Sequence, residues 1–247
     1  MEQPSDEDRR KQLWKRLLKR FHEACSTYGL LHEEDHILVG LSGGKDSLLL
    51  LELLAYQARI ARPKLTVEAA HVRMGNVKYE TDTTYLERFA AERGVKLHVL
   101  ETRFDYQQGN KKPVCFLCSW YRRKALFNLA QELGCNKIAL GHHQDDLVHT
   151  TLMNLFFQGQ FATMPALLQM RKMPLAIIRP LCMEREAEII EYARLADYQK
   201  QVKLCPYEKV SHRAAVAQLF LQIEQMNPEA RYSVWNALEA QGKLKEE

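Results

Sequence analysis

The sequence of 247 residues has little of what marks fibrous, disordered or membrane-spanning chains. Only 11 glycines and 8 prolines are present, which excludes collagen-like and low-complexity chains. The longest strongly apolar stretch, Leu48 to Ala55, is interrupted by Glu52, whereas a membrane span needs about 18 apolar residues. The N-terminus also lacks the apolar core of a signal peptide. We therefore expect a soluble, cytoplasmic, globular protein with no membrane partner.

The six cysteines do not indicate disulfides, because a chain of this length without an export signal is expected to keep its thiols reduced. Cys25, Cys135 and Cys182 lie within or beside predicted elements, and we expect them to be buried packing residues. Cys115 and Cys118 are three residues apart at the start of a predicted helix and can share one metal or cluster. That spacing alone also suits a redox pair, half a zinc site or chance.

Charge is mildly basic, with a net value of +4 and a pI near 8.7. Residues 9–20 hold seven Lys or Arg and no acid, and their apolar residues recur at helical spacing after a capping Ser5. The pattern predicts a basic amphipathic helix. Its charged side either faces solvent or contacts a polyanion such as nucleic acid.

Strand and helix patterns alternate from residue 36 onward. We expect strands at His36–Leu41, Leu65–Val72, Val95–Glu101, Lys137–Leu140 and Ala176–Leu181. Helices are expected at Ser47–Arg59, Thr81–Arg93, Phe116–Leu133, Asp145–Phe157, Glu184–Ala196, His212–Met226 and Pro228–Ala240, with an irregular basic segment at Arg103–Val114 and only helix beyond Cys205. The alternation predicts an α/β fold with a doubly wound, mostly parallel sheet and helical additions at both ends. The expected divisions are 1–34, 35–205 and 206–247.

A glycine-rich loop joins the first strand to its helix. The segment from Gly40 to Ser47 reads Gly-Leu-Ser-Gly-Gly-Lys-Asp-Ser. Its glycines and the helix N-terminus suit phosphate oxygens, Lys45 adds positive charge, and Ser42 and Ser47 add hydroxyl groups. Lys45 is followed by Asp46, so the loop is not a Walker A sequence. The alternative is an ordinary strand-to-helix turn.

A second polar segment follows a later strand, where residues 141–146 read Gly-His-His-Gln-Asp-Asp. We expect Gly141 near the bound nucleotide. Carboxylates combined with phosphate oxygens form typical Mg²⁺ sites, and Asp46 and Asp146 are the candidate ligands. Asp145 and Asp146 could instead be acids that favour the helix dipole.

Two levels of resemblance follow from these motifs. The segment Ser42-Gly43-Gly44-Lys45-Asp46-Ser47 resembles the PP-loop of N-type ATP pyrophosphatases, with their adenine nucleotide alpha-hydrolase-like fold. The PP-loop, Cys115-x-x-Cys118 with its basic helix, the Gly-His-His-x-Asp-Asp segment, Arg179-Pro-Leu181 and a distal Cys205 together resemble the TtcA-type tRNA 2-thiocytidine synthetases over roughly residues 36–206. A further cysteine usual in that family is replaced here by Glu208, and the chain is shorter than many members of that family.

The resemblance implies ATP-dependent tRNA thiolation. Residues 42–47 and Gly141 would bind ATP, and Lys45, Asp46 and Asp146 would be catalytic, with Mg²⁺ on the two aspartates. Cys115, Cys118 and Cys205 would hold a [4Fe–4S] cluster with one iron free of protein ligands. A pyrimidine 2-oxygen, expected to be that of cytidine, would be adenylated and then replaced by sulfur. The sulfur would come through the cluster from a donor such as a cysteine desulfurase or free sulfide.

The same interpretation also assigns the residues that would contact RNA. Arg122 and Arg123 would contact substrate or nucleotide phosphates, unless they only face solvent. The N-terminal helix, residues 103–124 and the C-terminal helices would hold the tRNA backbone. Tyr106, Phe116 or Trp120 would stack on a loop base or pack around the cluster.

Two other hypotheses for the function remain open. One is a PP-loop enzyme that thiolates or amidates a small molecule. The other is a zinc-stabilised nucleotide-binding protein, in which Cys115, Cys118, Cys205 and His212 hold the metal. The sequence also leaves open whether the chain forms a homodimer.

Overall fold

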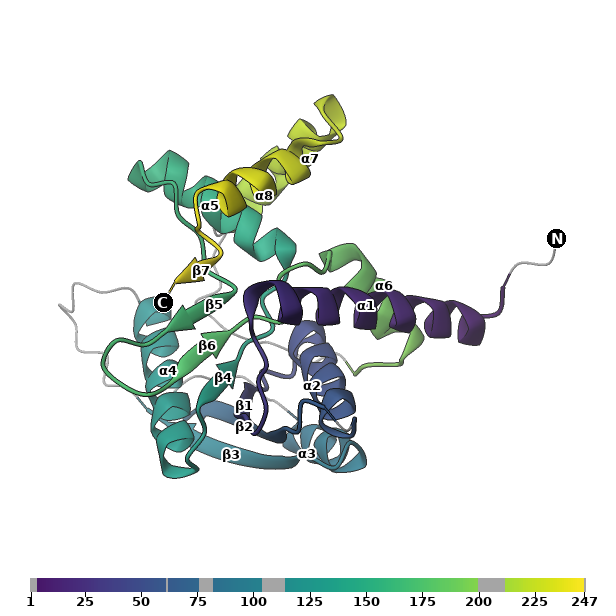
Figure 1. The fold of residues 1–247 in the computed structure, drawn as a ribbon, viewed down its shortest axis with the longest axis vertical. Coiled ribbons are helices and arrows are strands. Elements are labelled where there is room, and N and C mark those ends of the chain that lie inside the picture. Colours follow the sequence, from purple (N-terminus) through teal and green to yellow (C-terminus); the bar gives the residue numbers. More distant parts are fainter. Residues whose placement is uncertain (1–3, 61, 76–81, 104–113, 200–211, 247) are drawn as a thin grey trace.

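The computed structural model describes residues 4–60, 62–75, 82–103, 114–199 and 212–246. These residues form one seven-stranded, mostly parallel sheet with helices on both faces (Figure 1), which confirms the predicted fold class. In chain order the elements are α1 (Asp6–Tyr28), β1 (His36–Gly40), α2 (Lys45–Ala58), β2 (Thr66–Met74), α3 (Thr83–Glu92), β3 (Lys96–Thr102), α4 (Val114–Glu132), β4 (Lys137–Ala139), α5 (Gln144–Gln158), β5 (Leu167–Gln169), β6 (Ala176–Ile178), α6 (Glu186–Leu195), α7 (His212–Met226), α8 (Ala230–Ala240) and β7 (Lys245–Glu246).

The strand order is β3-β2-β1-β4-β6-β5-β7, and strands β3 to β6 of that order run parallel. From β1 the chain moves outward in one direction to β2 and β3, and later in the other direction to β4 and β6. The strand order therefore reverses between β1 and β4. In open α/β sheets, ligands bind at the carboxyl ends of the strands at such a point.

Side chains of β1 alternate between two cores. Ile37 and Val39 are buried among the residues of α1, α2 and α3, whereas Leu38 belongs to a separate cluster with Leu129 and Ala130 of α4. This alternation is the two-residue period of a strand covered on both faces. It places α4 on the face opposite α1 and α2.

The N-terminal helix is part of the core. Leu13, Leu17 and Phe21 are at most 1% exposed and pack in the main hydrophobic cluster. On the outer side, Arg9 pairs with Glu191 at 2.6 Å, Arg16 with Glu188 at 3.6 Å, and Arg20 with Glu184 at 2.9 Å. These three arginines of α1 therefore contact acids of α6 or of the turn before it, while Arg10, Lys15 and Lys19 are exposed to solvent.

Two short strands were not expected from the sequence. β5 pairs antiparallel with β6, and β7 pairs with β5, so the prediction of helix alone beyond Cys205 is wrong. β5 has three residues and β7 has two, so neither is long enough to show the two-residue period of a strand. β5 pairs with backbone groups at the edge of β6 that would otherwise be unpaired. Helices α5, α7 and α8 share a third apolar cluster and project beyond the sheet edge (Figure 1).

Cys25, Cys135 and Cys182 are buried at 8%, 6% and 0% exposure, as predicted. Burial raises the pKa of Cys135 to about 11, and it also raises the pKa of Cys25 and Cys182. These thiols are consequently protonated packing groups at neutral pH. No helix among the described residues has the length and apolar composition needed to cross a membrane.

Candidate active site

The glycine-rich loop is held in a tight turn by its own serines. Ser47 Oγ donates to the Gly44 carbonyl at 2.9 Å and accepts from the Ser42 backbone N–H at 3.2 Å. Gly43 has φ of +81°, in the left-handed region that glycine adopts without strain. The turn leads into α2 with Gly44 as its N-cap residue. The first N–H groups of a helix have no partner within the helix, so this turn presents donors to an anion.

The second polar segment touches the start of α2. A Cβ atom added at Gly141 would lie 2.9 Å from the Asp46 carbonyl carbon and 3.0 Å from the Ser47 nitrogen. Only glycine allows the loop after β4 to approach the α2 backbone this closely. The two sequence motifs, more than 90 residues apart, thus meet at the point where the strand order reverses.

His143 lies among four carboxylates at this junction and is 5% exposed. Its Nε2 is 3.8 Å from Asp46 and 3.5 Å from Asp146, and its Nδ1 is 3.6 Å from Asp145. Burial alone would lower the pKa of His143, but the surrounding carboxylates outweigh it and the pKa is raised. The carboxylates therefore favour the protonated imidazole of His143, which lies between the two loops. The sequence analysis assigned no role to this residue.

Lys45 reaches across the same junction. Its Nζ donates to Glu186 Oε1 at 2.9 Å and to Asp46 Oδ2 at 3.2 Å. Burial opposes the charge of Lys45, but these two acids outweigh it and its pKa is raised. The positive charge is thus maintained at the mouth of the PP-loop. Glu186, which opens α6, was missed because no motif connects it to the loop in sequence.

Asp145 and Asp146 have different partners although they are adjacent. Asp145 is ion-paired with Arg231 of α8 at 2.7 Å and accepts the Glu186 backbone N–H at 2.8 Å. Burial opposes the Asp145 charge, yet His143, the Glu186 N–H and Arg231 lower its pKa. Its side chain is 13% exposed and that of Arg231 is 9% exposed. Asp145 is therefore a buried structural anion that joins α5, α6 and α8.

Asp146 instead faces the site. Its Oδ2 accepts the His143 backbone N–H at 3.3 Å, and its Oδ1 pairs at 2.7 Å with Arg213, whose side chain is 43% exposed. Arg213 also donates to Thr150 Oγ1 at 3.0 Å. Sequence reasoning missed Arg213 and Arg231 because two cationic residues on later helices give no spacing signal.

His142 is held neutral by Arg179 of the Arg-Pro-Leu segment. Arg179 Nε donates to His142 Nδ1 at 3.2 Å, so the ring proton of the neutral imidazole lies on Nε2. Burial and the Arg179 charge lower the pKa of His142 to about 4. The pKa values of the two adjacent histidines are therefore shifted in opposite directions.

Both candidate Mg²⁺ ligands are paired with cationic side chains. Asp46 Oδ1 is buried and lies 3.1 Å from Lys45 Nζ, which also donates to Oδ2 at 3.2 Å. Asp146 Oδ1 pairs with Arg213, and its Oδ2 accepts the His143 backbone N–H. Carboxylate oxygens also suit Mg²⁺, so a metal ion here would compete with Lys45 and Arg213. Within the described residues, no three His, Cys, Asp or Glu side chains are arranged to hold a metal ion by themselves.

The cysteine pair lies on the first turn of α4, with Cys115 exposed and Cys118 partly exposed. Two thiols one helical turn apart at a helix N-terminus are suitable donors for a metal cluster. The proposed third ligand Cys205, the position of Glu208, Tyr106 and most of the irregular segment 103–114 lie outside the described residues. His212, the alternative zinc ligand, contacts the ring of Phe157 at 5.2 Å between centroids.

Arg122 lies one turn after Cys118 and close to the PP-loop. Together with burial, its charge lowers the pKa of His71, whose Nδ1 lies 2.7 Å from the carbonyl of Leu41 at the start of the loop. Arg123 is exposed, and its Nε donates to the Ser119 carbonyl at 3.2 Å. The two arginines thus differ: Arg122 is partly exposed and acts electrostatically on His71, whereas Arg123 is exposed to solvent.

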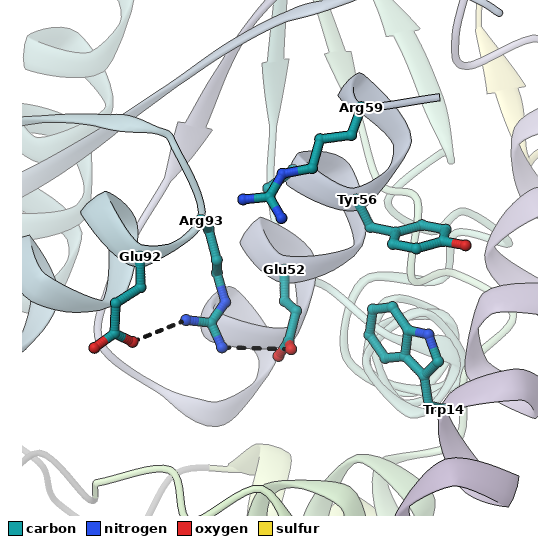
Figure 2. A pocket seen from close by; sticks show the side chains of 7 residues that line it. Trp14, Glu52, Tyr56, Arg59, Glu92 and Arg93 are labelled. Atoms are coloured by element: carbon teal, nitrogen blue, oxygen red, sulfur yellow. Dashed lines mark ion pairs between the residues drawn. The ribbon is translucent and has the colours of Figure 1, made fainter. Parts of the chain in front are cut away.

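A cavity of about 320 Å³ lies elsewhere, between α1, α2 and α3 (Figure 2). Arg93 pairs there with Glu52 at 3.3 Å and with Glu92 at 3.8 Å, beside Trp14 and Tyr56. The residues of α2 that line this cavity belong to the C-terminal half of the helix, whereas the glycine-rich loop precedes its N-terminus. With 14 residues, α2 is about 20 Å long, so this cavity is separate from the glycine-rich loop.

Comparisons with known proteins agree with this geometry. Residues 10–201 match the family model of the PP-loop domain. The chain is 31% identical to tRNA-cytidine(32) 2-sulfurtransferase 1 of Francisella tularensis, covering 95% of this chain and 89% of the relative. It is 32% identical to the tRNA-cytidine(32) 2-sulfurtransferase of Shewanella pealeana, covering 96% and 77%.

Among solved structures, the U34-tRNA thiolase NcsA from Methanococcus maripaludis, which contains a [4Fe–4S] cluster, matches with a TM-score of 0.79. The two chains are 25% identical, and the match covers 93% of this chain and 80% of NcsA. The family model, the relatives and the site geometry lead to one conclusion. The chain belongs to the PP-loop family, in the group that contains the tRNA 2-sulfurtransferases.

Proposed function

We propose that this protein is an ATP-dependent tRNA sulfurtransferase that replaces the 2-oxygen of cytidine by sulfur. The observation that carries the proposal is the close approach of the loop after β4 to the start of α2, which Gly141 allows. This approach brings Asp46 and Asp146 together at Nε2 of His143. The named activity of the relatives supports tRNA as the substrate.

The first step is adenylation of the base. The pyrimidine 2-oxygen attacks the α-phosphorus of ATP, a new P–O bond forms, and the bond to the β-phosphate oxygen breaks to release pyrophosphate. Residues 42–47 and Gly141 would bind the phosphates, and Lys45 would stabilise the negative charge that develops on them. Asp46 and Asp146 would hold Mg²⁺, with the metal ion replacing the contacts that Lys45 and Arg213 make with these carboxylates.

The second step exchanges oxygen for sulfur. A sulfide nucleophile adds to C2 of the adenylated base, and AMP departs with the original oxygen as the C2–O bond breaks. A [4Fe–4S] cluster bound by Cys115, Cys118 and Cys205 would supply this sulfur. The exposed position of Cys115 at the start of α4 leaves the cysteine pair accessible to a sulfur donor. Arg122 would contact phosphate beside the PP-loop, and Arg123 would contact the RNA backbone.

We assign a separate role to each of the three expected divisions of the chain. Residues 35–205 would carry the nucleotide site and the cysteines, and 1–34 and 206–247 would add helices around them. The later helices also supply Arg213 and Arg231 to the site aspartates.

Reconstitution with purified protein tests the proposal. Protein prepared anaerobically is incubated with ATP, Mg²⁺, sulfide and tRNA, and AMP, pyrophosphate and 2-thiocytidine are measured. We expect AMP and pyrophosphate in equal amounts, dependent on tRNA, and a strong loss in Asp46→Asn. Equal activity without tRNA would favour a small-molecule substrate, and zinc without iron in the purified protein would contradict the cluster.

A further inference from the structure

The first half of α4 is unusual for a helix that packs on a sheet. None of the residues 114–124 is buried, whereas Leu129 and Ala130 in the second half are buried against the sheet. A surface helix normally buries one apolar stripe along its whole length. The exposed half nevertheless carries two large aromatic side chains, Phe116 at 43% and Trp120 at 44% exposure.

Topology places this half of α4 at the catalytic edge of the sheet. The helix ends at Glu132, shortly before β4 begins at Lys137, so its C-terminus lies at the amino ends of the strands. Its 19 residues extend about 28 Å in the opposite direction, toward the carboxyl ends, where the PP-loop lies. The effect of Arg122 on the pKa of His71, beside that loop, agrees with this placement.

Two stripes run along nearly opposite sides of this half. Cys115, Cys118 and Arg122 follow helical spacing on one side. On the other side lies the aromatic–cationic stripe, consisting of Phe116, Trp120, Arg123 and Lys124. Lys124 Nζ lies 5.4 Å from the centre of the Trp120 ring, and Tyr121 contacts the same ring edge to face at 4.8 Å. An exposed indole between cations suits a flat, electron-rich ring on a negatively charged backbone.

We infer that the aromatic–cationic stripe binds unpaired nucleotides of the substrate RNA, with Trp120 stacking on one of the unpaired bases. This inference rests on the proposed function. Arg123 and Lys124 would contact the phosphates that flank the stacked base. The protein would then bind RNA loops in preference to duplexes, since paired bases cannot stack on a side chain.

Binding of two RNAs tests the inference. One is a stem–loop with an unpaired loop that contains cytidine, and the other is a fully paired duplex with the same number of phosphates. Trp120→Ala should weaken stem–loop binding roughly 5- to 150-fold, the range measured for lost base stacking. Binding to the duplex should change less than about twofold, and Trp120→Phe should retain most of the affinity. The control is Tyr56→Ala, which removes a similarly exposed aromatic ring, 42% exposed, from α2.

Each outcome gives a distinct answer. Equal weakening of both RNAs, or of neither, would overturn the stacking role while leaving tRNA thiolation intact. If Trp120→Ala reduced thiolation only with a protein sulfur donor and not with sulfide, the stripe would bind that donor instead of RNA. A wild-type protein that binds neither RNA would refute the proposed function itself.

Discussion

Asp145 and Asp146 are expected to respond in opposite ways to the same substitution. Asp145→Asn removes the anion that Arg231 contacts at 2.7 Å in a region where both side chains are at most 13% exposed. Breaking a buried ion pair costs about 3–5 kcal/mol, and the lower end applies here because Arg231 keeps Glu224 at 2.8 Å. For a chain of this size, about 3 kcal/mol lowers the melting temperature by roughly 6–12 °C.

Asp146→Asn should be nearly neutral for folding. The amide oxygen of Asn can still accept the His143 backbone N–H, and the pair lost with the 43% exposed Arg213 contributes about 0–1 kcal/mol. The melting temperature should therefore fall by no more than about 4 °C. Pyrophosphate release should nevertheless fall at least about 100-fold, the size of effect seen when a preorganised group that stabilises charge is lost.

Thermal unfolding and tRNA-dependent pyrophosphate release, measured on both variants well below their melting temperatures, provide the test. Asp145→Asn should keep activity within about tenfold of the wild type. An Asp146→Asn protein with unchanged activity, or an Asp145→Asn protein with unchanged stability, would refute the assignment of one structural and one reactive carboxylate.

Three further predictions concern the loop contact, the interior and α1. Gly141→Ala should lower stability by about 1–3 kcal/mol and should also lower pyrophosphate release, because the added Cβ would meet backbone atoms of α2. The control is Gly134→Ala, where φ is +71° and no atom lies within 4 Å of the added Cβ. This variant should lower stability alone. Burial raises the pKa of Glu184 to about 8, so the folded state favours its protonated form and loses up to about 1.4 kcal/mol of stability per pH unit as pH rises from 5 to 8. Denaturant unfolding should show this loss in the wild type and not in Glu184→Gln. Replacing the exposed Lys15 and Lys19 by Glu should weaken tRNA binding and reduce the slope of log Kd against log salt by about 1–2, with an unchanged slope excluding α1 from the RNA interface.

The sheet and the two active-site loops were predictable because their signals are local. Strands such as His36–Gly40 are continuous apolar runs, and the loops after β1 and β4 contain glycine exactly where the backbone turns or approaches another segment closely. The rule that ligands bind at the carboxyl ends of parallel strands then brings Asp46 and Asp146 to one edge. Local pattern and topology together therefore sufficed for this part.

The partners of these residues could not be predicted. Arg213, Arg231 and Glu186 come from helices that are distant in sequence, and nothing in their local pattern indicates that they contact the loop aspartates or Lys45. The partners of the basic helix could not be predicted for a related reason. Its arginines contact acids of the later α6 region, which is visible only once the chain has folded.

Thionucleosides in cellular tRNA give the most direct test of the central claim. Tandem mass spectrometry of nucleosides from tRNA of cells with and without the gene should show 2-thiocytidine only when the gene is present. Wild-type protein supplied from a plasmid should restore it, and Asp46→Asn should not. An unchanged set of thionucleosides after deletion would contradict the assignment of tRNA thiolation to this protein.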